Sequence, residues 1–424
     1  MQRIIEFDVR IWLPGEAEAV QAGHVFFENN RTMFLYNRRY LKKETAISIY
    51  SKDLMMGGDE IEMGDGRIFV PSLRDALPDL WGRRAIAAGY RHCGFDPYRG
   101  DDIDEYVVAM QMGPDRIGAL DIRLPSAKML IKKDRRPPLK DLMALADLIE
   151  ANKEVEDADL WDLIPHCAMI GGARPKALYT NAAGAKLIAK FTAARDTYPV
   201  VQGEYVAMRL AALAGLDVAP VDIEMLAGRP VLLVERFDRV ARRGGGWTRR
   251  AMVSALTWAQ EAELSAHHIS YPQLAGIIAG SFEEAPAALE EIFTRLVFSI
   301  LVGNTDDHAR NHAAFWDGHS HRLTPAYDIA PQRRTSREAG QAMLLADGSR
   351  AAQLRNVAAI APVFGVDEPQ FDRIVDRLVG TIKDFWVDVC DEARLSRKER
   401  EAFAGQQFFN SYAFDDFGPV PSLS

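Results

Sequence analysis

The stretch GNTDDHARNHAAFWDG, residues 303–318, places acids, two histidines, an arginine and two asparagines between apolar segments. It follows the apolar run RLVFSILV (295–302) and leads into LTPAYDIA (323–330). A loop this polar at the end of an apolar helix is either a solvated turn or an active site. The surrounding sequence has to decide between these two interpretations.

The spacing of the polar residues is typical of a protein kinase. A kinase places its catalytic aspartate five positions before a metal-binding asparagine, and a second metal-binding aspartate follows after a short hairpin. Here Asp306 precedes Asn311 by five positions, and HAAFWDGHSHRLTPAYD (312–328) predicts two short strands around the turn DGHS before Asp328. One carboxylate orients the substrate hydroxyl, while a carboxylate and an amide oxygen hold Mg²⁺ against the phosphates.

A kinase also needs a lysine on an upstream strand and an acid on the next helix to orient it. The strand LIAKF places Lys190 on the face opposite Leu187 and Ala189. Glu204 on the following helix is the candidate partner, and Lys186, at the start of the strand, is the competing lysine. The later strand VLLVERF (231–237) falls where a kinase has the connector that binds adenine through its backbone.

A glycine-rich segment, IGGARPKALY (170–179), precedes the lysine strand. It is no Walker A loop, because no G-K-[ST] follows. The segment is either a simple glycine turn or a phosphate-binding loop that uses backbone N–H groups and Lys176 as a point charge. The candidate loop residues are Gly171, Gly172, Ala173, Arg174 and Lys176.

Composition sets limits on the class of protein. The chain has 424 residues, 48% of them hydrophobic and 26% charged, which is ordinary for a soluble globular protein of two or three domains. A net charge of −9 argues against a nonspecific nucleic-acid or membrane binder. Three widely spaced cysteines support neither a disulfide framework nor a zinc site, and no signal peptide or membrane span is predicted. We expect a cytoplasmic protein.

Periodicity predicts strands first and helices later. Alternation predicts strands at 4–13, 23–28 and 31–36, with a hairpin turn at 29–30, and further strands at 118–124, 185–191, 221–226 and 229–237. Helical spacing predicts helices at 72–90, 102–112, 202–216, 288–304, 367–393 and 396–409. Pro137 and Pro138 break any regular element between the two halves.

Taken in order, these motifs resemble the HipA-type serine/threonine kinases, the toxins of bacterial type II toxin–antitoxin modules. The resemblance covers nearly the whole chain. It is carried by DALPDLWGRRAI (75–86), GGARPKA (171–177), GEYVAMRLAALAGLDVAP (203–220), LLVERFDR (232–239), TDDHARN (305–311) and PAYDIAP (325–331). It implies an α+β fold with a two-lobed, protein-kinase-like core, a smaller mixed α/β N-terminal domain and a helical C-terminal lobe. The expected boundaries are 1–125 for the N-terminal domain, 126–160 for a connecting segment, 161–400 for the kinase core and 401–424 for a tail.

The resemblance also implies roles. Asp306 would be the catalytic base, Asn311 and Asp328 the Mg²⁺ ligands, and Lys190 the contact to the α- and β-phosphates of ATP. The hinge backbone at Glu235 and Phe237 would hold adenine, and His308 would brace the catalytic loop.

The family's partners follow from the same resemblance. They are a HipB-like helix-turn-helix antitoxin that makes most of the contact with operator DNA, and a protein substrate such as an aminoacyl-tRNA synthetase.

The chain departs from the family pattern just before the glycine loop. Family members often carry an autophosphorylated serine just before the glycine loop, but the matching residue is Met169, and no Ser or Thr lies between Ile164 and Tyr179. Self-inactivation by that route is therefore not expected here. Pro175, where the family pattern has an acid, is a lesser departure.

Other functions remain open at this point. A metal-dependent phosphohydrolase could use Asp306, Asp307, His308 and His312, although the acid of an H-E-x-x-H motif is missing. A small-molecule kinase on the same fold would share every motif, because the sequence does not show which hydroxyl is attacked. A kinase-like binding protein without turnover is disfavoured, since every expected catalytic position is filled.

Overall fold

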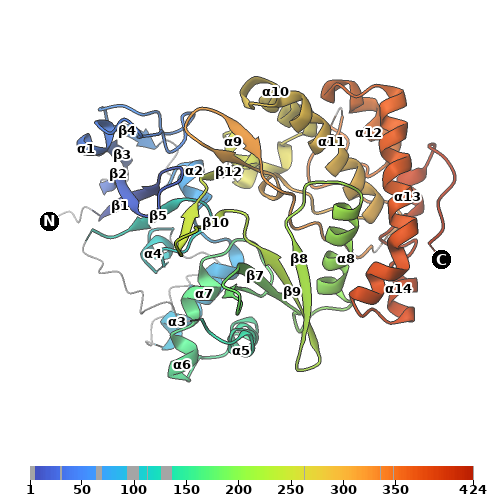
Figure 1. Ribbon diagram of the computed structural model, residues 1–424, viewed down its shortest axis with the longest axis horizontal. Helices are drawn as coiled ribbons and strands as arrows, with labels where there is room; N and C mark the ends of the chain where they lie inside the picture. Colours follow the sequence, from blue (N-terminus) through green and yellow to red (C-terminus); the bar gives the residue numbers. More distant parts are fainter. Residues whose placement is uncertain are drawn as a thin grey trace. The chain divides into compact units, whose positions relative to one another are not determined.

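The computed structural model describes residues 5–28, 31–63, 69–92, 105–111, 113–125, 136–261, 263–334, 336–346 and 348–423. The chain divides into two compact units, coloured along the sequence in Figure 1. Unit 1 comprises residues 1–194, 233–253 and 315–319, and unit 2 comprises residues 195–232, 254–314 and 320–424. The predicted hairpin turn at 29–30 lies outside the described residues. The expected domain boundaries stay a prediction.

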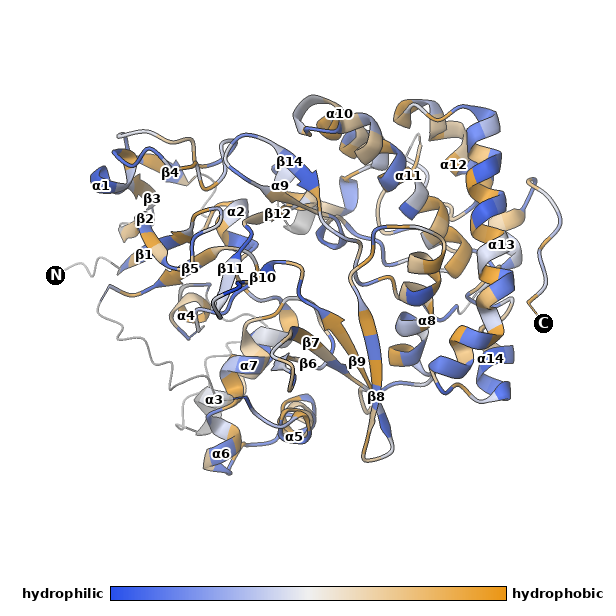
Figure 2. Ribbon diagram, viewed as in Figure 1, coloured by the Kyte–Doolittle hydropathy of each residue, from blue (hydrophilic) through white to orange (hydrophobic). Residues whose placement is uncertain are grey.

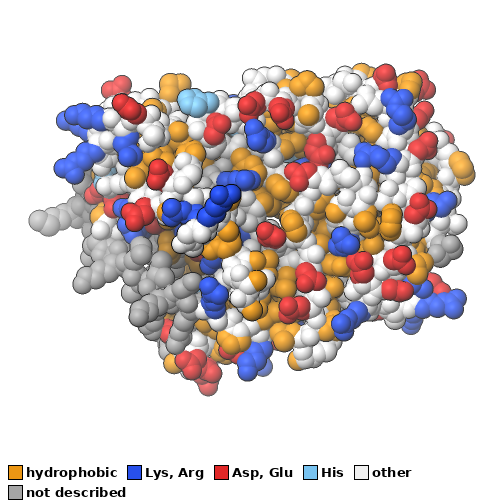
Figure 3. All heavy atoms as spheres, viewed as in Figure 1, with side chains coloured by type: hydrophobic (Ala, Val, Ile, Leu, Met, Phe, Trp, Pro, Cys, Tyr) orange, Lys and Arg blue, Asp and Glu red, His pale blue; other side chains and the backbone are white. Residues whose placement is uncertain are grey.

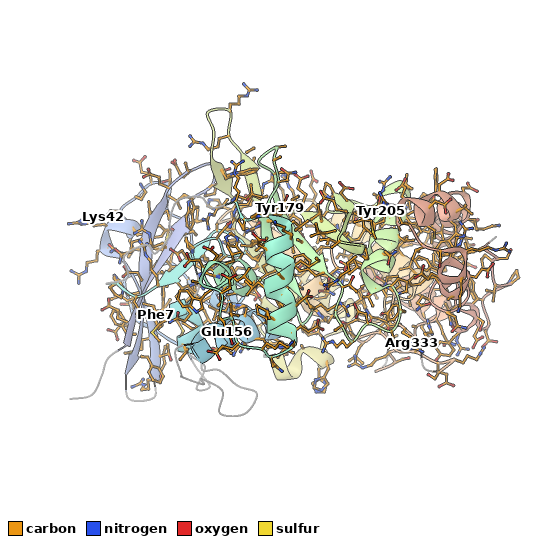
Figure 4. All side chains as sticks on the ribbon, turned by 90° about the horizontal axis from the view of Figure 1, so that it is seen from below. Phe7, Lys42, Glu156, Tyr179, Tyr205 and Arg333 are labelled. Atoms are coloured by element: carbon orange, nitrogen blue, oxygen red, sulfur yellow. The ribbon has the colours of Figure 1, made fainter. Side chains whose placement is uncertain are left out.

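Unit 1 begins with a five-stranded sheet of order β4-β3-β2-β1-β5. Its strands are β1 (Ile5–Trp12), β2 (Ala19–Glu28), β3 (Arg31–Tyr36), β4 (Ile61–Met63) and β5 (Leu120–Arg123). The predicted alternation is confirmed, because Phe7, Val9 and Ile11 are buried while the residues between them are partly exposed. Phe7 is labelled on this sheet in Figure 4. One hydrophobic face of each strand therefore builds the core of this sheet.

Short helices complete this part of unit 1. They are α1 (Arg38–Leu41), α2 (Pro71–Arg74), α3 (Leu80–His92), α4 (Glu105–Gln111), α5 (Leu139–Glu150), α6 (Ala158–Trp161) and α7 (Ile164–Ala168). The prediction of one helix over 72–90 is wrong. Pro78 lies between α2 and α3, and its ring and missing N–H group disfavour a continuous helix. The break lets α3 start afresh, with Trp81 fully buried in its first turn.

A second set of strands in unit 1 carries the candidate nucleotide residues. Strands β6 (Lys176–Thr180) and β7 (Lys186–Phe191) pair antiparallel, and β9 (Arg229–Glu235) is the next neighbour of β7. The chain passes from unit 2 to unit 1 within β9, after Leu232. Strands β10 (Arg239–Ala241), β11 (Trp247–Arg249) and β12 (Met252–Ser254) follow.

Unit 2 is mostly helical. Its helices are α8 (Val200–Leu213), α9 (Ala255–Trp258), α10 (Tyr271–Ser281), α11 (Ala285–Val302), α12 (Leu354–Ile360), α13 (Glu368–Glu392) and α14 (Arg397–Phe403). Strand β8 (Val221–Leu226) forms a hairpin with β9. Strands β13 (Ala313–Trp316) and β14 (His321–Leu323) form the predicted hairpin around DGHS, of which residues 315–319 belong to unit 1. Four 3-10 turns complete the list: η1 (Glu263–His268), η2 (Ala309–Asn311), η3 (Ala361–Phe364) and η4 (Ser411–Phe414).

The core of unit 2 forms around α11, which packs against α10, α12 and α13. Figure 2 shows the hydrophobic and hydrophilic stripes of α13. Its buried residues recur at helical spacing, as in Phe371, Ile374 and Leu378, so one face of the helix covers the core. The predicted helix over 396–409 is shorter than expected, since α14 ends at Phe403 and the chain turns at Gly405 with φ of 75°.

The charged side chains on one face and the hydropathy of the helices both bear on the environment of the surface. Acidic and basic side chains are interspersed over the face shown in Figure 3. Across the described segments, no helix has both the length and the apolar character required to cross a membrane.

Candidate active site

The polar loop of residues 304–311 begins where α11 ends. Gly303 closes the helix in the left-handed conformation, with φ of 71°. A Cβ at this position would lie 2.7 Å from the carbonyl oxygen of Gln407, so the close approach requires glycine. The helix stops abruptly there, and the loop starts from a rigid core element. This is the arrangement that the sequence predicted.

The backbone of the loop brings Asp306 and Asn311 together. The N–H of His308 donates to the carbonyl of Asp306 at 2.9 Å, and the N–H of Asn311 donates to the carbonyl of His308 at 2.8 Å. The side-chain nitrogen of Asn311 donates to the carbonyl of Asp306 at 3.3 Å. Because the amide nitrogen is used in this way, Oδ1 of Asn311 is the atom left to accept a cation.

Asp328 follows the β13–β14 hairpin and has an unusual backbone. Its φ is 60°, a left-handed conformation that costs free energy for a residue with a side chain. Neighbouring hydrogen bonds hold the segment in place. The Tyr327 hydroxyl donates to the carbonyl of Arg310 at 2.7 Å, and the N–H of Ala326 donates to the carbonyl of Asp217 at 2.7 Å. Strained conformations of this kind are concentrated at functional sites.

Asp306 and Asp328 interact electrostatically. Desolvation by neighbouring protein atoms raises the pKa of Asp306, and the negative charge of Asp328 raises it further, while His308 opposes the shift. The charge of Asp328 therefore disfavours the ionised form of Asp306. A cation bound near both would relieve this repulsion, which fits the predicted metal role of Asp328.

Asp307 has a different environment from Asp306. Its side chain is buried, accepts a hydrogen bond from the Tyr271 hydroxyl, and lies 3.0 Å from Nε2 of His312. Among the described residues, Asp306, Asp307, His308 and His312 provide no group of three ligand atoms within 4.8 Å of one another. The phosphohydrolase interpretation therefore gains no support from the geometry.

In unit 1, the strand pair β6–β7 presents two lysines together. Lys190 lies directly opposite Lys176 in the antiparallel register. As predicted, Leu187 and Ala189 are buried on the other face of β7. The competing lysine, Lys186, has a carboxylate partner, since its Nζ lies 3.8 Å from Oδ2 of Asp115. Lys190 thus lies on the face of β7 where the sequence predicted it, and its contact with phosphate stays a prediction.

Two residues that were not among the predicted site residues, Asp79 and Trp81, hold the glycine loop in place. The N–H of Gly172 donates to Oδ2 of Asp79 at 2.8 Å, and its carbonyl accepts from the N–H of Trp81 at 2.9 Å. Gly172 has φ of 89°, and a Cβ there would lie 2.3 Å from Nζ of Lys176. The loop conformation therefore requires glycine and places the ammonium group of Lys176 against the loop. Gly171 and Arg174 are partly exposed, and Ala173 is exposed.

The predicted hinge segment after β9 is anchored by a buried ion network. Arg236 binds Asp238 at 2.9 Å and Asp115 at 3.1 Å, and Arg239 binds the same two carboxylates. These arginines hold the pKa of Asp115 and of Asp238 below the usual range, although burial alone would raise both. Glu235 is exposed, and the ring of Phe237 packs edge-on against Phe315 with centroids 6.0 Å apart. The motif ERFDR was visible in the sequence, but its partner Asp115 lies 121 positions from Arg236.

Glu204 is buried on α8 in unit 2, and Lys190 belongs to unit 1. Their pairing therefore stays a prediction.

Comparison with known proteins places the chain in a family. The model of the HipA-like C-terminal domain matches residues 168–386, which is more than half of the chain. The chain is 29% identical over 133 residues to Y4mE of Sinorhizobium fredii, a provisionally assigned kinase, covering 30% of this chain and 31% of that protein. It is 25% identical over 252 residues to the serine/threonine-protein kinase toxin HipA of Shewanella oneidensis, covering 53% of this chain and 56% of HipA. The alignments thus span about a third and about half of these relatives.

A solved structure shows the same fold over most of the chain. It is the complex of HipA, HipB and operator DNA from Shewanella oneidensis, with a TM-score of 0.68, 18% identity, and coverage of 94% of this chain and 93% of that chain. The predicted mixed α+β fold, with an N-terminal sheet and a C-terminal kinase region, is confirmed. The chain therefore belongs to the HipA-like kinase family.

Proposed function

We propose that the protein is an ATP- and Mg²⁺-dependent serine/threonine-protein kinase that acts as the toxin of a toxin–antitoxin module. The observation that carries the proposal is the loop after α11, in which the Asn311 side chain donates to the backbone carbonyl of Asp306 and the charge of Asp328 acts on the Asp306 carboxyl group. Membership in the HipA-like family supports the same activity. The proposed location is the cytoplasm.

The residues of unit 2 provide the chemistry of transfer. Asp306 would orient the substrate hydroxyl and accept its proton. Oδ1 of Asn311 and the carboxylate of Asp328 would hold Mg²⁺, because oxygen atoms of amides and carboxylates are the ligands that this cation prefers. Bound Mg²⁺ neutralises charge on the phosphates. His308, whose N–H donates to the carbonyl of Asp306, would brace the loop.

The residues of unit 1 would bind the nucleotide. Lys190 and Lys176 would contact phosphates, together with the loop residues Gly171, Gly172, Ala173 and Arg174. The backbone at Glu235 and Phe237 would bind adenine, as the connecting segment of a kinase does. The N–H of Gly172 is bound to Asp79, so a phosphate contact through that group requires Asp79 to release it.

The proposed partners come from the family. The solved relative is a complex of HipA with HipB and operator DNA. We propose a HipB-like antitoxin for this chain, with most of the DNA contact made through that partner. The net charge of −9 agrees, because a chain with an overall negative charge is repelled by the phosphates of DNA. Tight binding of random DNA by the isolated chain at physiological salt would contradict this part of the proposal.

The decisive experiment is phosphoryl transfer from labelled ATP into a host lysate. Wild type should label one or a few proteins on Ser or Thr, with an aminoacyl-tRNA synthetase as the proposed class of target. Asp306→Asn should bind nucleotide normally but lose transfer, because the substitution removes only the charge that orients and deprotonates the hydroxyl. Asp328→Ala should weaken Mg²⁺ and nucleotide binding together.

The matched control is Asp317→Asn, an exposed aspartate in the β13–β14 turn. It makes the same chemical change as Asp306→Asn and should leave transfer intact. Label that appears only in small molecules would replace the protein-kinase proposal with a small-molecule kinase. Full transfer by Asp306→Asn would show that the catalytic assignment is wrong.

A further inference from the structure

Two residues that directly follow the proposed site residues bind each other. Asp307 follows Asp306, His312 follows Asn311, and Nε2 of His312 lies 3.0 Å from Oδ1 of Asp307. Both side chains are buried. The pair therefore joins the two ends of the loop at the positions next to the site residues.

Tyr271 completes this group from another helix. It lies in the first turn of α10, and its hydroxyl donates to Oδ2 of Asp307. Its ring meets the His312 ring edge-on, with centroids 6.0 Å apart and an angle of 77° between the planes. The N–H of Tyr271 donates to the carbonyl of Leu344 at 2.9 Å, which fixes the start of the helix. Oδ2 of Asp307 thus accepts a hydrogen bond from Tyr271, and Oδ1 lies close to the His312 ring.

The interactions within this group favour the ionised form of the buried Asp307 carboxylate. Burial raises the pKa of Asp307, but His312 and the Tyr271 hydroxyl outweigh this effect, so the pKa lies below its usual value. An ionised carboxylate in this environment is stable only while its partners stay in place. Its position is therefore narrowly determined, and so is the backbone that it shares with Asp306.

We propose that Asp307, His312 and Tyr271 are positioning residues for the transfer loop. This inference rests on the proposed function of Asp306 and Asn311. With the Asp307 side chain held inward, the Asp306 side chain is exposed and the Asp306 carbonyl stays where the Asn311 amide donates to it. That contact orients Oδ1 of Asn311. The three residues thus act on metal binding and on the catalytic carboxylate through geometry, without touching the substrate.

The first test replaces Asp307 by asparagine and measures the Mg²⁺ dependence of transfer. We expect kcat to fall by about 10- to 100-fold and the Mg²⁺ concentration for half-maximal rate to rise by a similar factor, as is usual when partners of metal ligands are lost. Binding of a fluorescent ATP analogue without metal should change less than about threefold, because the nucleotide contacts proposed for unit 1 are untouched. A residue with a purely structural role would lower the folded fraction but leave the Mg²⁺ dependence of the remaining enzyme unchanged.

A second pair of variants controls for misfolding of Asp307→Asn. Tyr271→Phe removes a single hydroxyl, and its matched control is Tyr205→Phe. Tyr205, labelled in Figure 4, donates its hydroxyl to Glu392 at 2.9 Å in the same unit. Tyr271→Phe should raise the Mg²⁺ requirement, and Tyr205→Phe should not. His312→Gln keeps a polar side chain beside Asp307, so it should retain much more activity than His312→Ala.

A binding measurement separates this inference from the proposed function. Mn²⁺ binding in the presence of a non-hydrolysable ATP analogue can be followed by electron paramagnetic resonance, whether or not transfer occurs. Weaker Mn²⁺ binding in Asp307→Asn and Tyr271→Phe supports the inference even if no substrate is found. Equal Mn²⁺ binding in wild type and both variants overturns it. Absence of transfer in the wild type, with Mn²⁺ binding lost in the variants, counts against the proposed function alone.

Discussion

Lys176 and Lys190 lie directly opposite each other across the antiparallel pair β6–β7. Two like charges at opposite positions of a sheet destabilise it unless another group compensates them. Lys176 is also buried against the glycine loop. A phosphate bound beside these lysines would be attracted by both ammonium groups. The sheet register and the glycine-rich segment thus both indicate a phosphate-binding site beside Lys176.

The register makes a prediction about nucleotide binding. Lys190→Met should weaken ATP binding by about tenfold or more, since a charge-assisted contact to phosphate is lost. Lys186→Met is the matched control on the same strand, because its ammonium group already pairs with Asp115. Isothermal titration with ATP and Mg²⁺ measures both. An equal loss of ATP affinity in the two variants would show that Lys190 is not part of the site.

Met169 leads to a prediction about regulation. It follows α7, is buried, and its sulfur would lie 3.0 Å from a Cβ placed on Gly113, so it packs rather than reacts. Incubation with Mg²⁺ and ATP should leave residues 164–180 without the adduct of about 80 Da that one phosphate adds. Intact mass and peptide mapping test this directly. Met169→Ser would restore a hydroxyl at this position and should show the adduct together with loss of activity.

A stoichiometric adduct on wild-type residues 164–180, with activity lost in step, would show that the inference from Met169 is mistaken. Tyr179 and Thr180 belong to β6, beyond the loop. An adduct there that leaves activity unchanged would not bear on the loop.

Asp238 is expected to be critical for the stability of unit 1. It is buried, accepts from both Arg236 and Arg239, and accepts from the N–H of Gly118 at 2.7 Å. Asp238→Ala leaves two buried guanidinium groups with one carboxylate fewer, so the free energy of unfolding should fall by about 3–5 kcal/mol. Chemical denaturation measures the change. Glu62→Gln, which removes an exposed ion pair with Arg31, should leave the midpoint unchanged within error.

Asp53 makes the stability of unit 1 depend on pH. Burial raises its pKa from 3.8 to about 6, against the opposing effect of two hydrogen bonds from Ser72. Between these two pKa values the folded state binds more protons than the unfolded state, so stability falls as pH rises through this window. Asp53→Asn removes this contribution. The stability of the variant relative to wild type should therefore increase from about pH 4 to about pH 6 and stay level above it. A constant difference over that range would contradict the assignment.

Much of the fold follows from local sequence. Alternation in β1 places Phe7, Val9 and Ile11 on one buried face, and the apolar spacing of α13 predicts its buried stripe. The helix predicted over 288–304 is confirmed as α11, which begins at Ala285 and ends two residues earlier than predicted, at Val302. The prediction of one helix over 72–90 was wrong because the apolar spacing continues through Pro78, whereas the helical backbone is interrupted there. A periodic pattern alone does not show how far one helix extends.

The sequence by itself determined the family, the mixed α+β fold and the order of the motifs, because spacing such as that from Asp306 to Asn311 is a property of the chain. It also determined that Met169 offers no hydroxyl before the glycine loop. Only the tertiary structure decided that Asp307 is buried against Tyr271, 36 positions away, and that Asp79 binds the N–H of Gly172, 93 positions away. It likewise decided that Asp115 lies beside Arg236. The physical reason is that burial and charge pairing depend on which distant segments meet in space, and no local period carries that information.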